Sequence, residues 1–281
     1  MPSVPPTAAG RGTAQSTPLP RSARFADYAV MAVAVVLGGG SLLLFALTGR
    51  VTLVPMGLSP AAALWWNGFL SLVFFLQHSL MVRRRVRARL VAVVPARYDG
   101  AFYAITAGAA LTCFVVFYQQ VEEPPLFALH GAARVLVIAA ALLALAIFGW
   151  ATLALHTLDA FGLDPIRRHL RGGAADARPE TVFPAKAFVV AGPFRFVRHP
   201  IYAAVIVLLW ATPRMGPGRF ELAVLWTAWI LAGATLEERD LVADFGEAYR
   251  EYRRRVPMFV PWRRPLPIRH GSPASQHHVD G

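Results

Sequence analysis

The sequence of 281 residues has a single cysteine, a single lysine and few charged residues, which make up 16% of the chain. A soluble domain carries about 25% charged residues, and a disordered chain is rich in charge and poor in apolar side chains. A single cysteine excludes an intramolecular disulfide and a multi-cysteine metal site. Because 56% of the residues are hydrophobic, a disordered chain, a collagen and an ordinary soluble enzyme are all excluded.

The few charged residues are unevenly divided between the two signs. Lysine and arginine number 28 and aspartate and glutamate 16, which gives a net charge of +12. Such an excess is typical of proteins that bind nucleic acid or a membrane surface. The apolar composition favours the membrane, so we expect no nucleic-acid partner.

Long apolar runs indicate transmembrane helices, because a bilayer core of about 30 Å requires about 20 apolar residues per helix. Four runs have this length, at residues 28–48, 61–82, 100–118 and 133–157. Two shorter runs, 201–213 and 220–236, are separated by a turn rich in proline and glycine and indicate a helical hairpin that is tilted or crosses only partly. We therefore expect an all-α integral membrane protein with about six transmembrane helices and an amphipathic C-terminal helix on the cytoplasmic side.

The distribution of arginine predicts the orientation of these spans. Six spans place 24 of the 28 basic residues on one side, which the positive-inside rule identifies as cytoplasmic. Both termini are then cytoplasmic, and arginine in place of lysine indicates a GC-rich bacterial genome and hence an inner-membrane protein. The basic run at 83–89 is expected to contact anionic lipid.

Three segments divide the chain in this interpretation: a disordered tail at 1–26, a membrane domain at 27–262 and a second disordered tail at 263–281. A signal peptide is the alternative for the N-terminal region. The first apolar run exceeds the 7–15 residues of a signal-peptide core, so it is interpreted as a retained span.

Two polar segments lie at the two ends of the hairpin. Residues 192–202 read GPFRFVRHPIY, in which Pro200 suits the first turn of a helix. Arg198 and His199 then lie at a helix N-terminus with Tyr202 on the same side, an arrangement that attracts an anion such as a carboxylate. The alternative is that these arginines only flank a span.

The second polar segment begins with Glu237 and Glu238, directly after the last apolar run. Adjacent carboxylates at a membrane edge are costly and usually have partners. Beyond them, four apolar or aromatic residues spaced 4, 4 and 3 apart predict an interfacial amphipathic helix; these are Leu241, Phe245, Tyr249 and Tyr252. Because a hairpin returns to its starting side, the two carboxylates are expected beside Arg198 and His199.

These segments resemble the C-terminal signature of integral-membrane methyltransferases, which include isoprenylcysteine carboxyl and phospholipid methyltransferases. The resemblance is strongest over 189–262. Four further pieces are similar to bacterial methanethiol S-methyltransferases and NnrU-like membrane proteins: QHSLM at 77–81, FGW at 148–150, FGL at 161–163 and WATPRM at 210–215. One departure is the sequence LDA at 158–160, where that group has an Asn-His pair.

The resemblance implies S-adenosylmethionine as the methyl donor. Arg198 and the helix N-terminus can bind its carboxylate, Glu237 or Glu238 its ammonium or ribose hydroxyls, and Tyr202 or Tyr249 can offer a ring face to its sulfonium. His78 is the candidate base that activates a thiol acceptor, with His156 and Arg198 as alternatives. The expected donor-binding residues are Gly192, Pro193, Arg195, His199, Pro200, Tyr202, Glu237, Glu238, Tyr249 and Tyr252; the expected catalytic residues are Arg198, His78 and Glu238; no bound metal is expected.

The most favoured function is S-methylation of a small thiol such as methanethiol at the cytoplasmic membrane face. An isoprenylcysteine or a lipid is the alternative acceptor. A non-enzymatic, NnrU-like accessory protein of nitrogen-oxide metabolism is the main alternative from another class, in which His78, His156 and His199 could bind haem. A transporter is disfavoured, because many transporters contain internal repeats and none is visible here.

Overall fold

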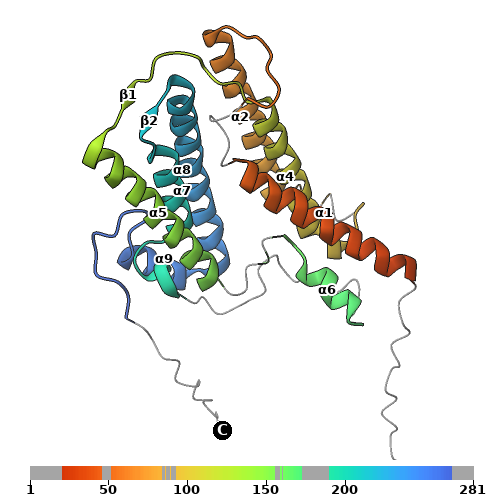
Figure 1. The fold of residues 1–281 in the computed structure, drawn as a ribbon. Helices are drawn as coiled ribbons and strands as arrows, with labels where there is room; N and C mark the ends of the chain where they lie inside the picture. Colours follow the sequence, from red (N-terminus) through yellow and green to blue (C-terminus); the bar gives the residue numbers. More distant parts are fainter. Residues whose placement is uncertain are drawn as a thin grey trace, which may run out of the picture.

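A computed structural model of the chain describes residues 21–45, 52–83, 86, 89, 93–155, 159, 161–172 and 190–267. The described part is mainly helical, which confirms the all-α class (Figure 1). Within these ranges, five helices are long and apolar enough to cross a membrane and a sixth apolar helix is shorter, as expected of an integral membrane protein. His156 and residues 1–20 and 268–281 of the expected tails lie outside the described residues.

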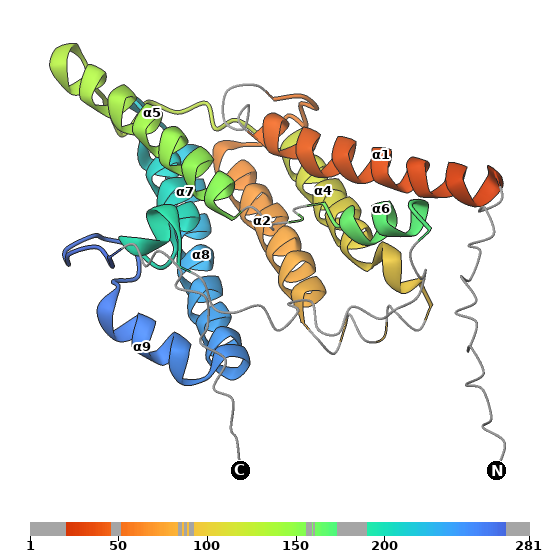
Figure 2. The same cartoon turned by 90° about the horizontal axis from the view of Figure 1, so that it is seen from below.

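One half of the bundle contains α1 (Arg21–Phe45), α2 (Pro60–Val82), the short 3-10 helix η1 (Ala96–Tyr98), α4 (Asp99–Phe117) and α6 (Asp164–Leu170). Helices α1 and α4 approach closely, because a Cβ on Gly108 would come within 2.4 Å of the carbonyl oxygen of Leu37. Small residues permit such contacts between membrane helices. The short helix α6 lies beside α1 and η1, so it closes one end of this half (Figure 2).

The other half contains α5 (Gly131–Ala154), the 3-10 helix η2 (Gly192–Arg195), α7 (Pro200–Trp210), α8 (Pro217–Phe245) and α9 (Glu247–Arg255). Helix α7 packs against α5 on one side and α8 on the other (Figure 1). Two short strands, β1 (Phe127–Ala128) and β2 (Arg214–Met215), pair antiparallel and join the connection before α5 to the α7–α8 turn. The α7–α8 hairpin is therefore held at both of its ends.

Aromatic side chains join the two halves where α2 and α8 meet. Phe74 stacks on Trp226 with ring centroids 5.1 Å apart, and Phe75 stacks on Trp229 at 4.6 Å. The indole N–H groups of the two tryptophans donate to serine hydroxyls of α2, each at 3.2 Å. This junction fixes the position of α8, and of α9 that follows it, relative to α2.

Only the second helix of the hairpin is long enough to cross a membrane. Helix α7 has 11 residues and a length of about 16 Å, roughly half of a bilayer core of about 30 Å. Helix α8 has 29 residues and a length of about 44 Å, so it extends beyond the apolar run at 220–236. The length of α7 agrees with the expectation that the first helix of the hairpin does not span the bilayer upright.

The expected amphipathic stripe is divided between two helices. Helix α8 ends at Phe245, α9 begins at Glu247, and Gly246 between them has a φ of +56°. Only glycine adopts this conformation without strain, which is why the chain turns there. Leu241 and Phe245 nevertheless pack with Tyr249 and Tyr252 in one apolar cluster.

Two described segments lie near the ends of the expected membrane domain. Helix α1 begins at Arg21, seven residues before the expected start of the first span. At the other end, the backbone of Leu266 exchanges hydrogen bonds with Arg195, whose carbonyl oxygen accepts from the Leu266 N–H at 3.2 Å. Leu266 therefore packs against the structure that begins with η2.

Candidate active site

The start of α7 and the C-terminal third of α8 meet at one end of the bundle. Pro200 occupies the first turn of α7, where its missing N–H costs nothing. The backbone N–H groups of Arg198 and His199 donate to the carbonyl oxygens of Pro257 and Met258, at 2.9 and 3.1 Å. The segment after α9 thus closes over the start of α7 and encloses the polar side chains there.

Glu238 is the centre of this arrangement and is 4% exposed. One carboxylate oxygen lies 2.5 Å from Nε of Arg198 and 3.3 Å from Nε2 of His199. The other oxygen lies 3.2 Å from Nε of Arg253 on α9. A buried carboxylate requires such compensation, so Glu238 is an anchor that holds α7, α8 and α9 together. We call Arg198, His199, Glu238 and Arg253 the ion-pair hub.

Arg198 is also occupied by the backbone. Its guanidinium donates to the carbonyl oxygens of Arg253, at 3.2 Å, and Val256, at 2.5 Å. These carbonyls belong to the end of α9, where a helix leaves its last acceptors without partners. Arg198 therefore caps α9 in addition to neutralising Glu238.

Glu237 differs from its neighbour in exposure and in partners. Its side chain is 45% exposed, and Nδ1 of His199 lies 3.8 Å from its carboxylate. The Tyr202 ring stacks on the His199 ring, with centroids 5.4 Å apart and planes 6° from parallel. Glu237 is thus an accessible carboxylate beside two stacked rings.

A cavity of about 320 Å³ adjoins the hub and is lined by four arginines: Arg198, Arg250, Arg253 and Arg254. Two of them, Arg250 and Arg254, form exposed ion pairs with Glu247. Exposed pairs of this kind are weak and leave the arginines able to rearrange around a ligand. We call this cavity the arginine pocket; it can accept a carboxylate or a phosphate.

Tyr249 and Tyr252 pack in the apolar cluster beneath α9 and are 2% and 6% exposed. The Tyr252 hydroxyl donates to the carbonyl oxygen of Phe194 at 2.7 Å. Burial raises the pKa of both hydroxyls above the ordinary tyrosine value, so they remain neutral. These two expected donor-binding residues hold α9 against η2.

Three residues of η2 also serve packing. Gly192 has a φ of +52°, and a Cβ there would come within 2.6 Å of the Cβ of Ala154 at the end of α5. Pro193 is buried, and the Arg195 guanidinium donates to the carbonyl oxygen of Leu266 at 2.5 Å. These expected donor-binding residues build the wall behind the ion-pair hub.

His78 lies on α2 at the aromatic junction between the two halves. The hydroxyl of Tyr103, on α4, is 3.2 Å from Nδ1 and 3.1 Å from Nε2 of the imidazole. The ring of Trp229 lies edge-on at 5.1 Å. The sequence analysis did not identify Tyr103 as a candidate. A tyrosine within an apolar span needs a hydrogen-bond partner, and this could have pointed to it.

A second polar cluster was also missed. Asp27 on α1 is fully buried, accepts from the Tyr98 hydroxyl at 2.5 Å and lies 3.3 Å from Nε of Arg97. His169 of α6 lies 3.8 Å from the other carboxylate oxygen. A carboxylate near the start of an apolar helix was the signal in the sequence for this cluster, which holds α1, η1 and α6 together.

Asp159 belongs to the segment LDA, in which this chain departs from the expected Asn-His pair. Its carboxylate accepts hydrogen bonds from the backbone N–H groups of Leu163 and Asp164 at the start of α6.

Several known proteins are similar in sequence to this chain. Residues 69–215 match the family described as NnrU protein. Methanethiol S-methyltransferase 1 of Bradyrhizobium diazoefficiens is 33% identical over 220 residues, which cover 73% of this chain and 70% of the relative. Methanethiol S-methyltransferase of Mycobacterium tuberculosis is 35% identical over 197 residues, 68% of this chain and 75% of the relative. Nurim of Rattus norvegicus is 25% identical over 201 residues, 64% and 68% of the two chains. No solved structure matches the chain.

Proposed function

This chain belongs to the NnrU family, and we propose that it transfers a methyl group from S-adenosylmethionine to the sulfur of methanethiol at a membrane face. The observation that carries the proposal is the meeting of the ion-pair hub, Glu237 and the arginine pocket at one end of α7 and α8. Relatives that are 33–35% identical over about 70% of the chain are named for this reaction.

The residues present fit the polar groups of the donor. Arg250, Arg253 and Arg254 face a cavity of about 320 Å³ and bind its carboxylate. Glu237, half exposed and beside this end of α8, accepts hydrogen bonds from its ammonium group. The stacked rings of His199 and Tyr202 offer a face to its sulfonium. When bound, S-adenosylmethionine supplies an electrophilic methyl carbon.

The acceptor side requires a thiolate, because a thiol with a pKa of about 8.5 or above is mostly protonated at neutral pH. His78 takes this proton in our proposal. The Tyr103 hydroxyl orients its ring, and Phe74 and Trp229 surround it with apolar surface that excludes water. His78 is thereby the catalytic base, whereas Arg198 and Glu238 position the donor site.

The end of the bundle that holds the hub is cytoplasmic in this proposal. The positive-inside rule supports this orientation, because six spans put 24 of the 28 basic residues of the sequence on this side. The site is then exposed to the S-adenosylmethionine of a bacterial cytoplasm, and both termini lie in the same compartment. Arg83 follows the last turn of α2, and the basic run of the sequence at 83–89 is proposed to contact anionic headgroups of the inner membrane.

Purified protein in detergent tests the proposal with methyl-labelled donor and three acceptors: methanethiol, a prenylcysteine and a phospholipid. We expect labelled dimethyl sulfide from the wild type and from Arg134→Gln, an exposed control on α5. Glu237→Gln should reduce donor binding and product together. Labelled prenylcysteine or phospholipid without dimethyl sulfide would contradict the thiol acceptor. Absence of donor binding by the wild type would instead favour a non-enzymatic accessory protein.

A further inference from the structure

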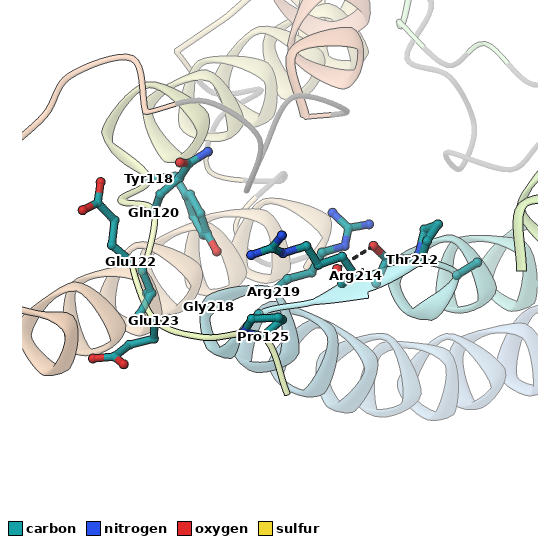
Figure 3. Close-up of a pocket in the computed structure, with 13 residues that line it drawn as sticks. Tyr118, Gln120, Glu122, Glu123, Pro125, Thr212, Arg214, Gly218 and Arg219 are labelled. Atoms are coloured by element: carbon teal, nitrogen blue, oxygen red, sulfur yellow. Dashed lines mark hydrogen bonds between the residues drawn. The ribbon is translucent and has the colours of Figure 1, made fainter. Parts of the chain in front are cut away.

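A second cavity, of about 430 Å³, lies at the end of the bundle opposite the arginine pocket (Figure 3). The segment that follows α4, the turn after α7 and the first turn of α8 form its walls. Gly218 in this cavity and Glu238 in the hub are twenty residues apart on one helix, a separation of about 30 Å. The cavity is therefore separated from the proposed donor site by about the thickness of a bilayer core.

Two arginines line the inner part of the cavity, and the carboxylate of Glu221, further along α8, also interacts with Tyr118. The side chains of Arg214 and Arg219 gather below Tyr118, whose hydroxyl points toward them (Figure 3). Tyr118 is 1% exposed. Helix α8 begins here without a side-chain cap or an acidic residue in its first turn. Its N-terminal dipole adds to the positive potential, so this part of the cavity suits an anion.

The walls of the cavity are fixed by the backbone. The N–H groups of Leu126 and Leu129 donate to the carbonyl oxygens of Met215 and Pro213, at 2.8 and 2.7 Å. A Cβ on Gly218 would come within 3.0 Å of the Tyr118 hydroxyl, so α8 can approach the phenol this closely only at a glycine. The cavity is thus preformed, and its volume lies within the range of about 300–1,000 Å³ that small ligands occupy.

The outer part of the cavity has the opposite charge. Glu122 and Glu123 are exposed and point away from the two arginines (Figure 3). A ligand that matches both parts carries an anion at its inner end and a cation at its outer end. Because α4 and α8 are membrane-spanning helices that meet here at their ends, the cavity lies at the depth of lipid headgroups.

We propose that this cavity binds the headgroup of a zwitterionic phospholipid of the phosphoethanolamine type. The phosphate binds Arg214, Arg219 and the Tyr118 hydroxyl, and the ammonium group faces Glu122 and Glu123. The phosphate is the part that the inner cavity recognises, and inorganic phosphate is the second possible source of the same chemistry. This inference does not depend on the methyl-transfer reaction.

The test measures affinity by thermophoresis with the full chain in detergent. The probes are dihexanoylphosphatidylethanolamine, dihexanoylglycerol and inorganic phosphate. We expect the phosphatidylethanolamine to bind and dihexanoylglycerol, which lacks the phosphate, not to bind. Arg214→Gln and Arg219→Gln should each weaken binding about tenfold or more, and Tyr118→Phe, which keeps the ring, about threefold. Arg134→Gln, on the same side of the membrane in the proposed topology, should retain wild-type affinity.

The two phosphate sources are separated by the third probe. Weaker binding of inorganic phosphate than of the lipid assigns the cavity to the headgroup, and equal binding with the same dependence on Arg214 and Tyr118 assigns it to free phosphate. The proposal is overturned if no phosphate-bearing probe binds. It is also overturned if Tyr118→Phe and both arginine variants bind as tightly as Arg134→Gln.

Discussion

Replacement of Glu238 by glutamine separates anchoring of the hub from binding of the donor. The substitution keeps the size of the side chain and removes its negative charge. Arg198 then has no counter-charge, although its side chain is only 11% exposed. The buried guanidinium would remain charged and would be held by carbonyl oxygens alone.

The size of the effect follows from burial. Removal of one partner from a buried ion pair costs about 3–5 kcal/mol. The contact of Glu238 with Arg253, whose side chain is 45% exposed, adds at most about 1 kcal/mol. Because the glutamine carbonyl still accepts one hydrogen bond, we expect a loss of about 3 kcal/mol. In a chain of this size that lowers the Tm by about 6–12 °C.

Glu237→Gln is the matched control on the adjacent position. Its side chain is 45% exposed and lies 3.8 Å from the imidazole of His199, so the Tm should change by less than about 2 °C. Donor affinity, measured by calorimetry, should fall about tenfold, because a charge-assisted hydrogen bond is lost.

Thermal unfolding of both variants in detergent decides between the two roles. A Glu238→Gln variant with the wild-type Tm and reduced donor affinity would show that Glu238, and not Glu237, holds the donor. Equal Tm values for the two variants would refute the account of Glu238 as an anchor.

Three further predictions concern other parts of the chain. His78→Gln should lower turnover of a thiol by about 10²–10⁴-fold with donor affinity intact, and the loss should shrink at high pH, where the thiol ionises unaided; a loss equal at every pH would assign His78 to packing. Burial raises the pKa of Tyr252, so above about pH 10 the unfolded state ionises first and stability falls; Tyr252→Phe should reduce this decline in measurements of Tm against pH. A reporter fused after Trp262 should be active only in the cytoplasm, and periplasmic activity would invert the proposed topology.

The meeting of Arg198 and His199 with the two glutamates could be predicted from the sequence. A hairpin returns its ends to one side, and the polar residues stand at those ends, so no detail of packing was needed. Sequence alone could not assign the two glutamates their different roles. Adjacent residues on a helix point about 100° apart, and only the position of α7 against α8 decides that Glu238 is buried and Glu237 is half exposed.

Two other features could not be predicted from the spacing of residues along the sequence. The 4, 4, 3 spacing of the apolar stripe fits one helix, yet Gly246 interrupts it, and the same residues meet across a turn. Tyr103 and Asp27 lie far in sequence from their partners His78 and Arg97. Such pairs depend on which helices become neighbours, which the pattern along a single helix does not contain.

The short length of α7 explains why the two ends of α8 depend on each other. Glu238 lies about 30 Å along α8 from its start, whereas α7 provides only about 16 Å of rise. The connection of residues 211–216 must supply the remaining distance in a nearly extended form, and β2 within it pairs with β1. The strand pair at one end of the bundle therefore sets the level at which Arg198 meets Glu238 at the other. If α7 shifted along α8 by one helical turn, about 5 Å, the contact of 2.5 Å between Arg198 and Glu238 would be lost. The hub therefore requires that the α7–α8 connection at the other end of the bundle keep its register.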